Sequence, residues 1–128
     1  MNRMKKDKIR TLVVDDSLFF QDAIKCFFES HPEIKLLGVM ETGEDALEFI
    51  EKEKPDLIIL DVRMSGMDGP QTARLIKGKY PWIKIIICTI WSENEAATYT
   101  AEAGADDYFV KGEPLPYLLK KIRVLFSC

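Results

Sequence analysis

Five short apolar runs alternate with longer amphipathic stretches along this chain of 128 residues, and that alternation limits its fold more than any other feature. The first four runs are rich in Val, Ile and Leu and lack a regular alternation of apolar and polar residues. Such runs are typical of strands that are covered on both faces of a parallel sheet. We predict strands over residues 11–14, 36–40, 57–60, 83–88 and 107–110.

The stretches between the runs repeat apolar residues at helical spacing, which predicts helices over residues 18–29, 44–53, 71–79, 93–103 and 115–126. The six prolines fall at the junctions or in first turns, where a missing N–H is tolerated. In the last helix, six apolar residues share an arc of about 120° and should face the sheet: Leu115, Leu118, Leu119, Ile122, Leu125 and Phe126. Strands alternating with helices imply one α/β domain over residues 1–128, with a parallel sheet and right-handed crossovers.

Charge and cysteine content narrow the setting. The net charge is −3 and the Lys and Arg residues are scattered, so we expect no direct binding to nucleic acid and none to a membrane. No apolar run approaches the length of about 18 residues that a membrane span needs. Cys26, Cys88 and Cys128 are odd in number and far apart, which predicts neither a disulfide framework nor a metal motif and indicates a reducing cytoplasm.

Polar residues stand where the predicted strands end. Asp15 and Asp16 follow the first strand, Asp61 the third, Thr89 the fourth and Lys111 the fifth. Because the carboxyl ends of parallel strands meet at one edge, where α/β sheets bind ligands, these five side chains should share a cleft. Taken singly each has an ordinary explanation, such as a helix cap or a turn; their joint placement does not.

Three carboxylates in one cleft repel one another, by about 4 kcal/mol for a pair about 4 Å apart at an effective dielectric near 20. A hard divalent cation offsets that repulsion, and oxygen ligands with room for water suit Mg²⁺. A lysine and a hydroxyl beside them are suited to phosphoryl oxygens. The predicted chemistry is phosphoryl transfer to a carboxylate.

The segments VVDDS, LIILDVRMSGMDG and GADDYFVKG, together with the threonine that ends the fourth strand, carry a family resemblance. In this order and spacing they resemble the receiver domain of bacterial two-component response regulators, over residues 9–126. The resemblance implies a flavodoxin-like, three-layer α/β/α fold, whose five-stranded parallel sheet has the order 2-1-3-4-5 and carries five helices. It also implies a signalling module that catalyses its own phosphorylation and dephosphorylation. The phosphodonor would be a histidine kinase or a phosphotransfer protein, and the output would be a partner or domain, with transcription among the outputs.

The resemblance gives each site residue a role. Asp61 would accept the phosphoryl group, and Asp15, Asp16, Asp61 and the backbone carbonyl of Arg63 would hold Mg²⁺. Thr89 and Lys111 would bind the phosphoryl group. Thr89 and Tyr108 would form the switch.

Three positions depart from the pattern common in the family: Ser65 and Gly112 stand where many members have proline, and Ile90 stands where the residue is usually small. Ile90, Trp91 and Arg63 border the approach of water to a phosphorylated Asp61. Ile90 adds bulk there, and Trp91 offers no group that could orient a water. We therefore expect these three residues to slow dephosphorylation.

Tyr117 and Val124 lie seven residues apart on the side of the last helix that points away from the sheet. They are either ordinary exposed apolar residues or, with Tyr108, a docking face for a second receiver or an output domain. This face would comprise the last strand and the last two helices.

Two alternatives stay open from the sequence. A hydrolase of the haloacid-dehalogenase type also forms an aspartyl phosphate with Mg²⁺, but its motif separates two aspartates by one residue, whereas Asp15 and Asp16 are adjacent. A receiver-like module that is never phosphorylated would not need an intact site.

Overall fold

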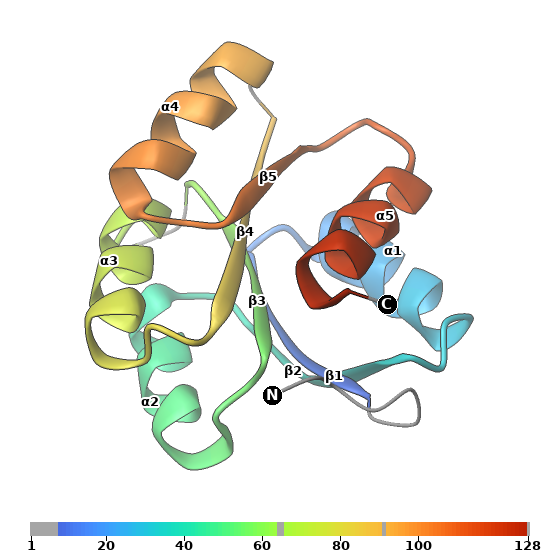
Figure 1. Cartoon of the computed structure of the whole chain (residues 1–128), viewed down its shortest axis with the longest axis horizontal. Coiled ribbons are helices and arrows are strands. Elements are labelled where there is room, and N and C mark those ends of the chain that lie inside the picture. The colour runs from blue at the N-terminus through green and yellow to red at the C-terminus, as the bar shows by residue number, and fades with distance from the viewer. Residues whose placement is uncertain (1–7, 64–65, 91, 128) are drawn as a thin grey trace.

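A computed structural model describes residues 8–63, 66–90 and 92–127 and contains five strands and five helices in strict alternation (Figure 1). The strands are β1 (Ile9–Val14), β2 (Ile34–Met40), β3 (Leu57–Asp61), β4 (Lys84–Thr89) and β5 (Asp107–Val110). The helices are α1 (Leu18–Glu29), α2 (Gly43–Glu53), α3 (Gly69–Lys79), α4 (Glu93–Ala103) and α5 (Leu115–Phe126).

All neighbouring strands pair in parallel, in the order β2-β1-β3-β4-β5, which confirms the expected topology. Helices α1 and α5 cover one face of the sheet, and α2, α3 and α4 cover the other (Figure 1). Each face has its own buried cluster because successive strand residues point to opposite sides. Val13 and Ile59 pack on the side of α1 and α5, whereas Leu12 and Ile58 pack on the side of α2 and α3.

The central strands are the most completely buried. Every residue of β3 is buried, as are the last five of β4, whereas β2 at the sheet edge buries fully only Ile34. This pattern explains the continuous apolar runs without regular alternation. The arc on α5 is also confirmed, since Leu118, Leu119 and Ile122 are buried against the sheet.

The sequence misplaces several boundaries by one or two residues. Strand β4 begins at Lys84 rather than at position 83, because the N–H of Ile83 donates to the carbonyl of Tyr80 in the turn that follows α3. Helix α3 begins at Gly69, where Asp68 caps it by accepting a hydrogen bond from the N–H of Gln71. Apolar spacing misses such turns and caps because they depend on single hydrogen bonds.

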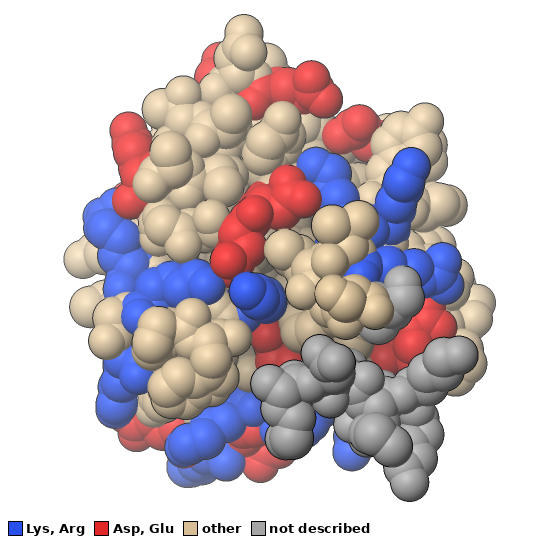
Figure 2. All heavy atoms as spheres, viewed as in Figure 1, with Lys and Arg blue, Asp and Glu red and all other residues tan. Residues whose placement is uncertain are grey.

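Basic and acidic side chains are interspersed on the face of the molecule shown in Figure 2.

Among the described residues, no helix is both long enough and apolar enough to cross a membrane.

Helix α4 is attached mainly by small side chains. Its buried residues are Ala96 and Ala103, and Tyr99 packs partly buried against the core, whereas α1 buries Phe20, Ile24 and Phe28. Burying one large apolar side chain contributes about 1.5–3 kcal/mol, so α4 has much less holding it to the sheet.

We therefore expect backbone amides of α4 to open to solvent with a free energy at least about 2 kcal/mol below that of α1. Native-state hydrogen exchange read residue by residue measures both helices in one sample. Equal protection of α4 and α1 would contradict this account of the packing.

Candidate functional site

The carboxyl edge of the sheet brings the predicted residues together. Asp61 ends β3 and lies opposite Cys88 in β4, and Thr89 is the next residue along that strand. The N–H of Lys111 donates to the carbonyl of Thr89 at 2.6 Å, which holds the chain after β5 against the end of β4. Asp15 follows β1, the strand that pairs with β3 from the other side.

Two hydrogen bonds, one from the cap residue of α1 and one from the helix itself, fix the turn that carries the adjacent aspartates. The N–H of Ser17 donates to Oδ1 of Asp15 at 2.8 Å, and Nε2 of the buried Gln21 donates to the backbone carbonyl of Asp15 at 2.6 Å. Asp15 is 1% exposed, whereas Asp16 is exposed to solvent. The two neighbouring carboxylates therefore sit in different environments.

Lys111 joins two of the carboxylates. Its Nζ lies 2.6 Å from Oδ2 of Asp15 and 3.5 Å from Oδ1 of Asp61. The ammonium also lies over the ring of Phe20, 4.6 Å from the ring centroid. Burial lowers the pKa of Lys111, but the short contact with Asp15 and the charges of Asp61 and Asp15 outweigh burial, so the net shift is upward. Lys111 is therefore a permanent cation in this cleft.

Asp61 loses its proton less readily than an ordinary aspartate. Burial and the charge of Asp15 raise its pKa from 3.8 to about 6, while Lys111 and a hydrogen bond from the backbone N–H of Arg63 pull it down. A charge held so far from its usual pKa carries a free-energy cost, which a cation bound at the site would relieve.

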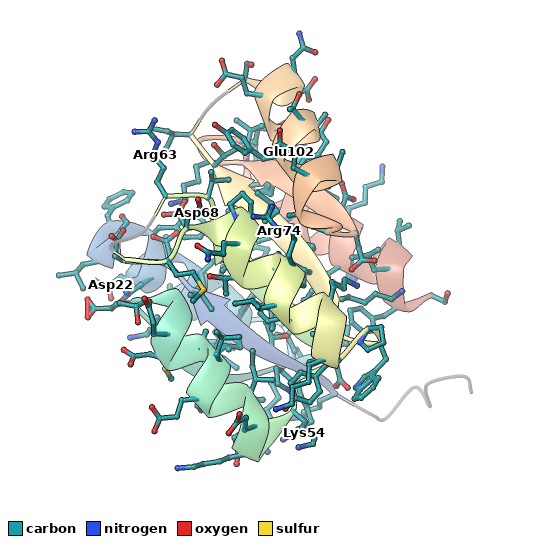
Figure 3. All side chains as sticks on the ribbon, turned by 90° about the vertical axis from the view of Figure 1, so that its left-hand side faces the viewer. Asp22, Lys54, Arg63, Asp68, Arg74 and Glu102 are labelled. Carbon is teal, nitrogen blue, oxygen red and sulfur yellow. The ribbon has the colours of Figure 1, made fainter. Side chains whose placement is uncertain are left out.

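Close packing shapes the loop after Asp61. A Cβ on Gly69 would lie 2.2 Å from the carbonyl oxygen of Asp61, so only glycine fits there, and the N–H of Gly69 donates to the carbonyl of Val62 at 2.9 Å. The loop is thereby drawn back over the end of β3. The Arg63 side chain projects from this loop into solvent (Figure 3).

The acidic cluster fits Mg²⁺. Asp15, Asp16 and Asp61 each offer a carboxylate oxygen, and these oxygens lie within 4.8 Å of one another. Oδ2 of Asp15 is buried and, in the part of the chain that the structure describes, makes no hydrogen bond of normal geometry, so its short contact is the ion pair with Lys111. An all-oxygen set with one solvent-exposed member is what a hard, partly hydrated cation requires.

The remaining predicted residues lie around this centre. Ile90 follows Thr89 and is 73% exposed. The Tyr108 ring lies under the ammonium of Lys121, with Nζ 4.3 Å from the ring centroid. Gly112 has φ of +101°, a conformation that glycine adopts readily and that the proline common at this position cannot adopt. The predictions for Ser65 and Trp91 fall outside the described residues.

Sequence reasoning missed Phe20 and Gln21, which both contact the site from α1. Phe20 and Gln21 follow the aspartate pair by about one helical turn. This spacing could have indicated that the first turn of α1 contacts the site. Contact between Phe20 and Lys111, however, joins segments far apart in the chain and depends on the tertiary fold.

Comparison with known proteins identifies relatives over nearly the whole chain. A family model described as the response regulator receiver domain matches residues 11–123. The chain is 41% identical over 105 residues to a protein-glutamate methylesterase/protein-glutamine glutaminase of Pyrococcus abyssi and 31% identical over 119 residues to the response regulator GacA of Pseudomonas aeruginosa. These alignments cover 81% and 93% of this chain, but 28% and 56% of the relatives, so the chain spans about half or less of their length.

A solved structure agrees. The response regulator domain of Thermotoga maritima CheB superposes with a TM-score of 0.84 at 30% identity, and the match covers 94% of this chain and 98% of that domain.

The raised pKa of Asp61 predicts how stability varies with pH. In the unfolded chain Asp61 ionises near 3.8, but in the folded, metal-free protein it ionises near 6. Between these values the folded state holds the proton more tightly, so the ionised carboxylate destabilises the fold as pH rises through this window. Asp61→Asn should therefore raise the free energy of unfolding at pH 7 without metal by about 1–3 kcal/mol, and much less near pH 4.

Denaturant melts in EDTA at several pH values measure this difference. The control is Asp16→Asn, which removes an exposed carboxylate of the same cluster and should change stability by less than about 1 kcal/mol. A difference between Asp61→Asn and the parent that does not vary with pH would contradict the assignment of strain to Asp61.

Proposed function

Because the chain belongs to the response regulator receiver domain family, we propose that it accepts a phosphoryl group on Asp61 from the histidine of a kinase or phosphotransfer protein. The observation that carries this proposal is the contact of one ammonium, Lys111, with both Asp15 and Asp61 at the carboxyl edge of the sheet. This cation is held beside a carboxylate whose pKa is raised. It can offset the negative charge that a transferred phosphoryl group brings to that carboxylate.

In the proposed reaction, a carboxylate oxygen of Asp61 attacks phosphorus and an O–P bond forms. The P–N bond of the donor phosphohistidine breaks, and the imidazole nitrogen leaves with the electron pair and takes a proton from solvent. Lys111 pairs with the phosphoryl oxygens, and the hydroxyl of the buried Thr89 donates a hydrogen bond to one of them.

Asp15, Asp16, Asp61 and the carbonyl of Arg63 are the groups that would hold Mg²⁺. Bound there, the ion would offset the charge that gathers between the carboxylates and the phosphoryl oxygens. The fit rests on the three carboxylate oxygens within 4.8 Å and on their unequal exposure.

The conformational response runs through Thr89 and Tyr108 in this proposal. Thr89 ends β4, and the chain runs from it over two residues to the cap of the weakly anchored α4. A phosphoryl group that draws the Thr89 hydroxyl inward would shift the population between two arrangements of this segment. Tyr108 is half-buried and lies on the neighbouring strand, where Lys121 donates to its backbone carbonyl at 2.6 Å.

Two surfaces suit partners. Leu18 and Phe19, which are 67% and 86% exposed, begin α1 at the same edge as the site and would receive the phosphodonor protein. Tyr117 and Val124, 54% and 71% exposed on α5, would form with Tyr108 the face for an output domain or a second receiver. The methylesterase relative named above suggests regulation of a methylesterase as the output, and the resemblance seen in the sequence names transcription among the outputs.

Incubation with acetyl phosphate and Mg²⁺, read by intact mass, addresses the proposed function directly. The parent should gain one labile phosphoryl group, and Asp61→Asn should gain none. Asp22→Asn, an exposed aspartate on α1, is the matched control and should behave like the parent. A parent that stays unmodified would favour the module that is never phosphorylated, and steady release of phosphate from many donor molecules would favour a hydrolase.

The exposed Ile90 should prolong the life of the aspartyl phosphate. Its branched side chain follows Thr89 and, in this proposal, borders the approach of water to Asp61. Ile90→Ala should therefore lose the phosphoryl group about two- to fivefold faster after the donor is removed, a barrier change below about 1 kcal/mol. Leu75→Ala, an exposed apolar residue on α3, controls for loss of surface bulk. Unchanged decay in Ile90→Ala would exclude the steric explanation.

A further inference from the structure

We infer that Phe20 is a positioning residue for the reaction, because its ring face holds the Lys111 ammonium beside Asp15 and Asp61. The inference rests on the proposed function, since it concerns how the cation that meets the phosphoryl group is held. It assigns a role to an apolar residue of α1 that takes no part in bond making.

Among the described residues, the ammonium of Lys111 contacts two carboxylates and one aromatic ring. Nζ lies 2.6 Å from Asp15, 3.5 Å from Asp61 and 4.6 Å from the centroid of the Phe20 ring. A cation within about 6 Å of a ring centroid is attracted by the negative face of the ring. The Lys111 side chain is 13% exposed and Phe20 is 8% exposed, so little water competes with this attraction.

The first turn of α1 fixes the ring. Ser17 caps the helix by accepting a hydrogen bond from the N–H of Phe20 itself, and Gln21 ties the same turn to the carbonyl of Asp15. Phe20 also belongs to the buried cluster between the sheet and helices α1 and α5. The ring and the Asp15 carboxylate are therefore carried by one rigid unit.

A ring face has an advantage over a third oxygen at this position. Lys111 lies closer to Asp15 than to Asp61, so pairing with a phosphoryl group on Asp61 would turn its ammonium from the first carboxylate towards the second. An oxygen partner would bind the ammonium in one direction and would have to be released during that move. The attraction of a ring face is broad in direction, so the ammonium can pivot without losing its third partner.

Replacing the ring by an aliphatic side chain should weaken phosphoryl binding. Phe20→Leu keeps an apolar group but removes the ring face, and we expect about tenfold slower phosphorylation by acetyl phosphate and about tenfold weaker binding of the phosphoryl mimic beryllofluoride with Mg²⁺. Phe28→Leu is the matched control, because Phe28 is 3% exposed in the same helix and cluster. It should change both quantities by less than about twofold.

A double-mutant cycle separates positioning from general packing. In a Lys111→Met background the ring has no ammonium to hold, so adding Phe20→Leu should not weaken beryllofluoride binding further. An equal loss in both backgrounds would overturn the inference, as would a parent-like Phe20→Leu.

If the leucine variant fails to fold, fluorinated phenylalanine at position 20 provides a second test. One, two and three ring fluorines preserve the shape of the ring but weaken its negative face step by step. Beryllofluoride affinity should fall in the same order, and a flat series would overturn the inference. A parent that is phosphorylated while this series stays flat refutes the role of Phe20 alone, whereas a parent that is never phosphorylated refutes the proposed function and this inference together.

Discussion

One ammonium offsets the repulsion between buried carboxylates at the carboxyl edge of this sheet. Asp15 is 1% exposed and Asp61 is nearly as deeply buried, and two carboxylates so placed repel each other strongly in a medium of low dielectric. Lys111 contacts both, and it reaches them because the chain after β5 is hydrogen-bonded to the end of β4. The strand order β2-β1-β3-β4-β5 therefore does more than bury apolar side chains, since it brings a cation from the last strand to acids from the first and third.

Lys111 offsets only part of the free-energy cost of an ionised Asp61. A pKa of about 6 for Asp61 means that Lys111 and the N–H of Arg63 do not fully balance burial and the charge of Asp15. The fold tolerates this cost because its central strands are apolar on both faces, with Ile58, Ile86 and their neighbours completely buried. Functional sites commonly keep an unfavourable interaction that lowers stability. Here that interaction is the burial of the Asp61 charge, on the proposed phosphoacceptor.

Much of this arrangement could be predicted from the sequence. Runs of Val, Ile and Leu predicted the sheet because buried parallel strands have few other compositions, and the rule that strand ends converge predicted that Asp61, Thr89 and Lys111 would meet. What could not be predicted depends on the position of one segment against another. That Lys111 pairs more closely with Asp15 than with Asp61, and lies over Phe20, follows from the seating of α1 against the loop after β5, which periodicity does not encode.

The two sides of the site differ in how firmly they are packed against the core. This difference determines on which side a conformational change should spread. On the side of α1, Gln21 and Phe20 tie the acids and the ammonium to a helix that buries large side chains. On the other side, Thr89 leads towards α4, whose buried residues are alanines. A new charge on Asp61 pulls on both sides, but a given force produces the larger displacement where less apolar surface must be uncovered. The change should therefore travel from Thr89 towards α4 and β5, while Asp15 and the first turn of α1 keep their geometry.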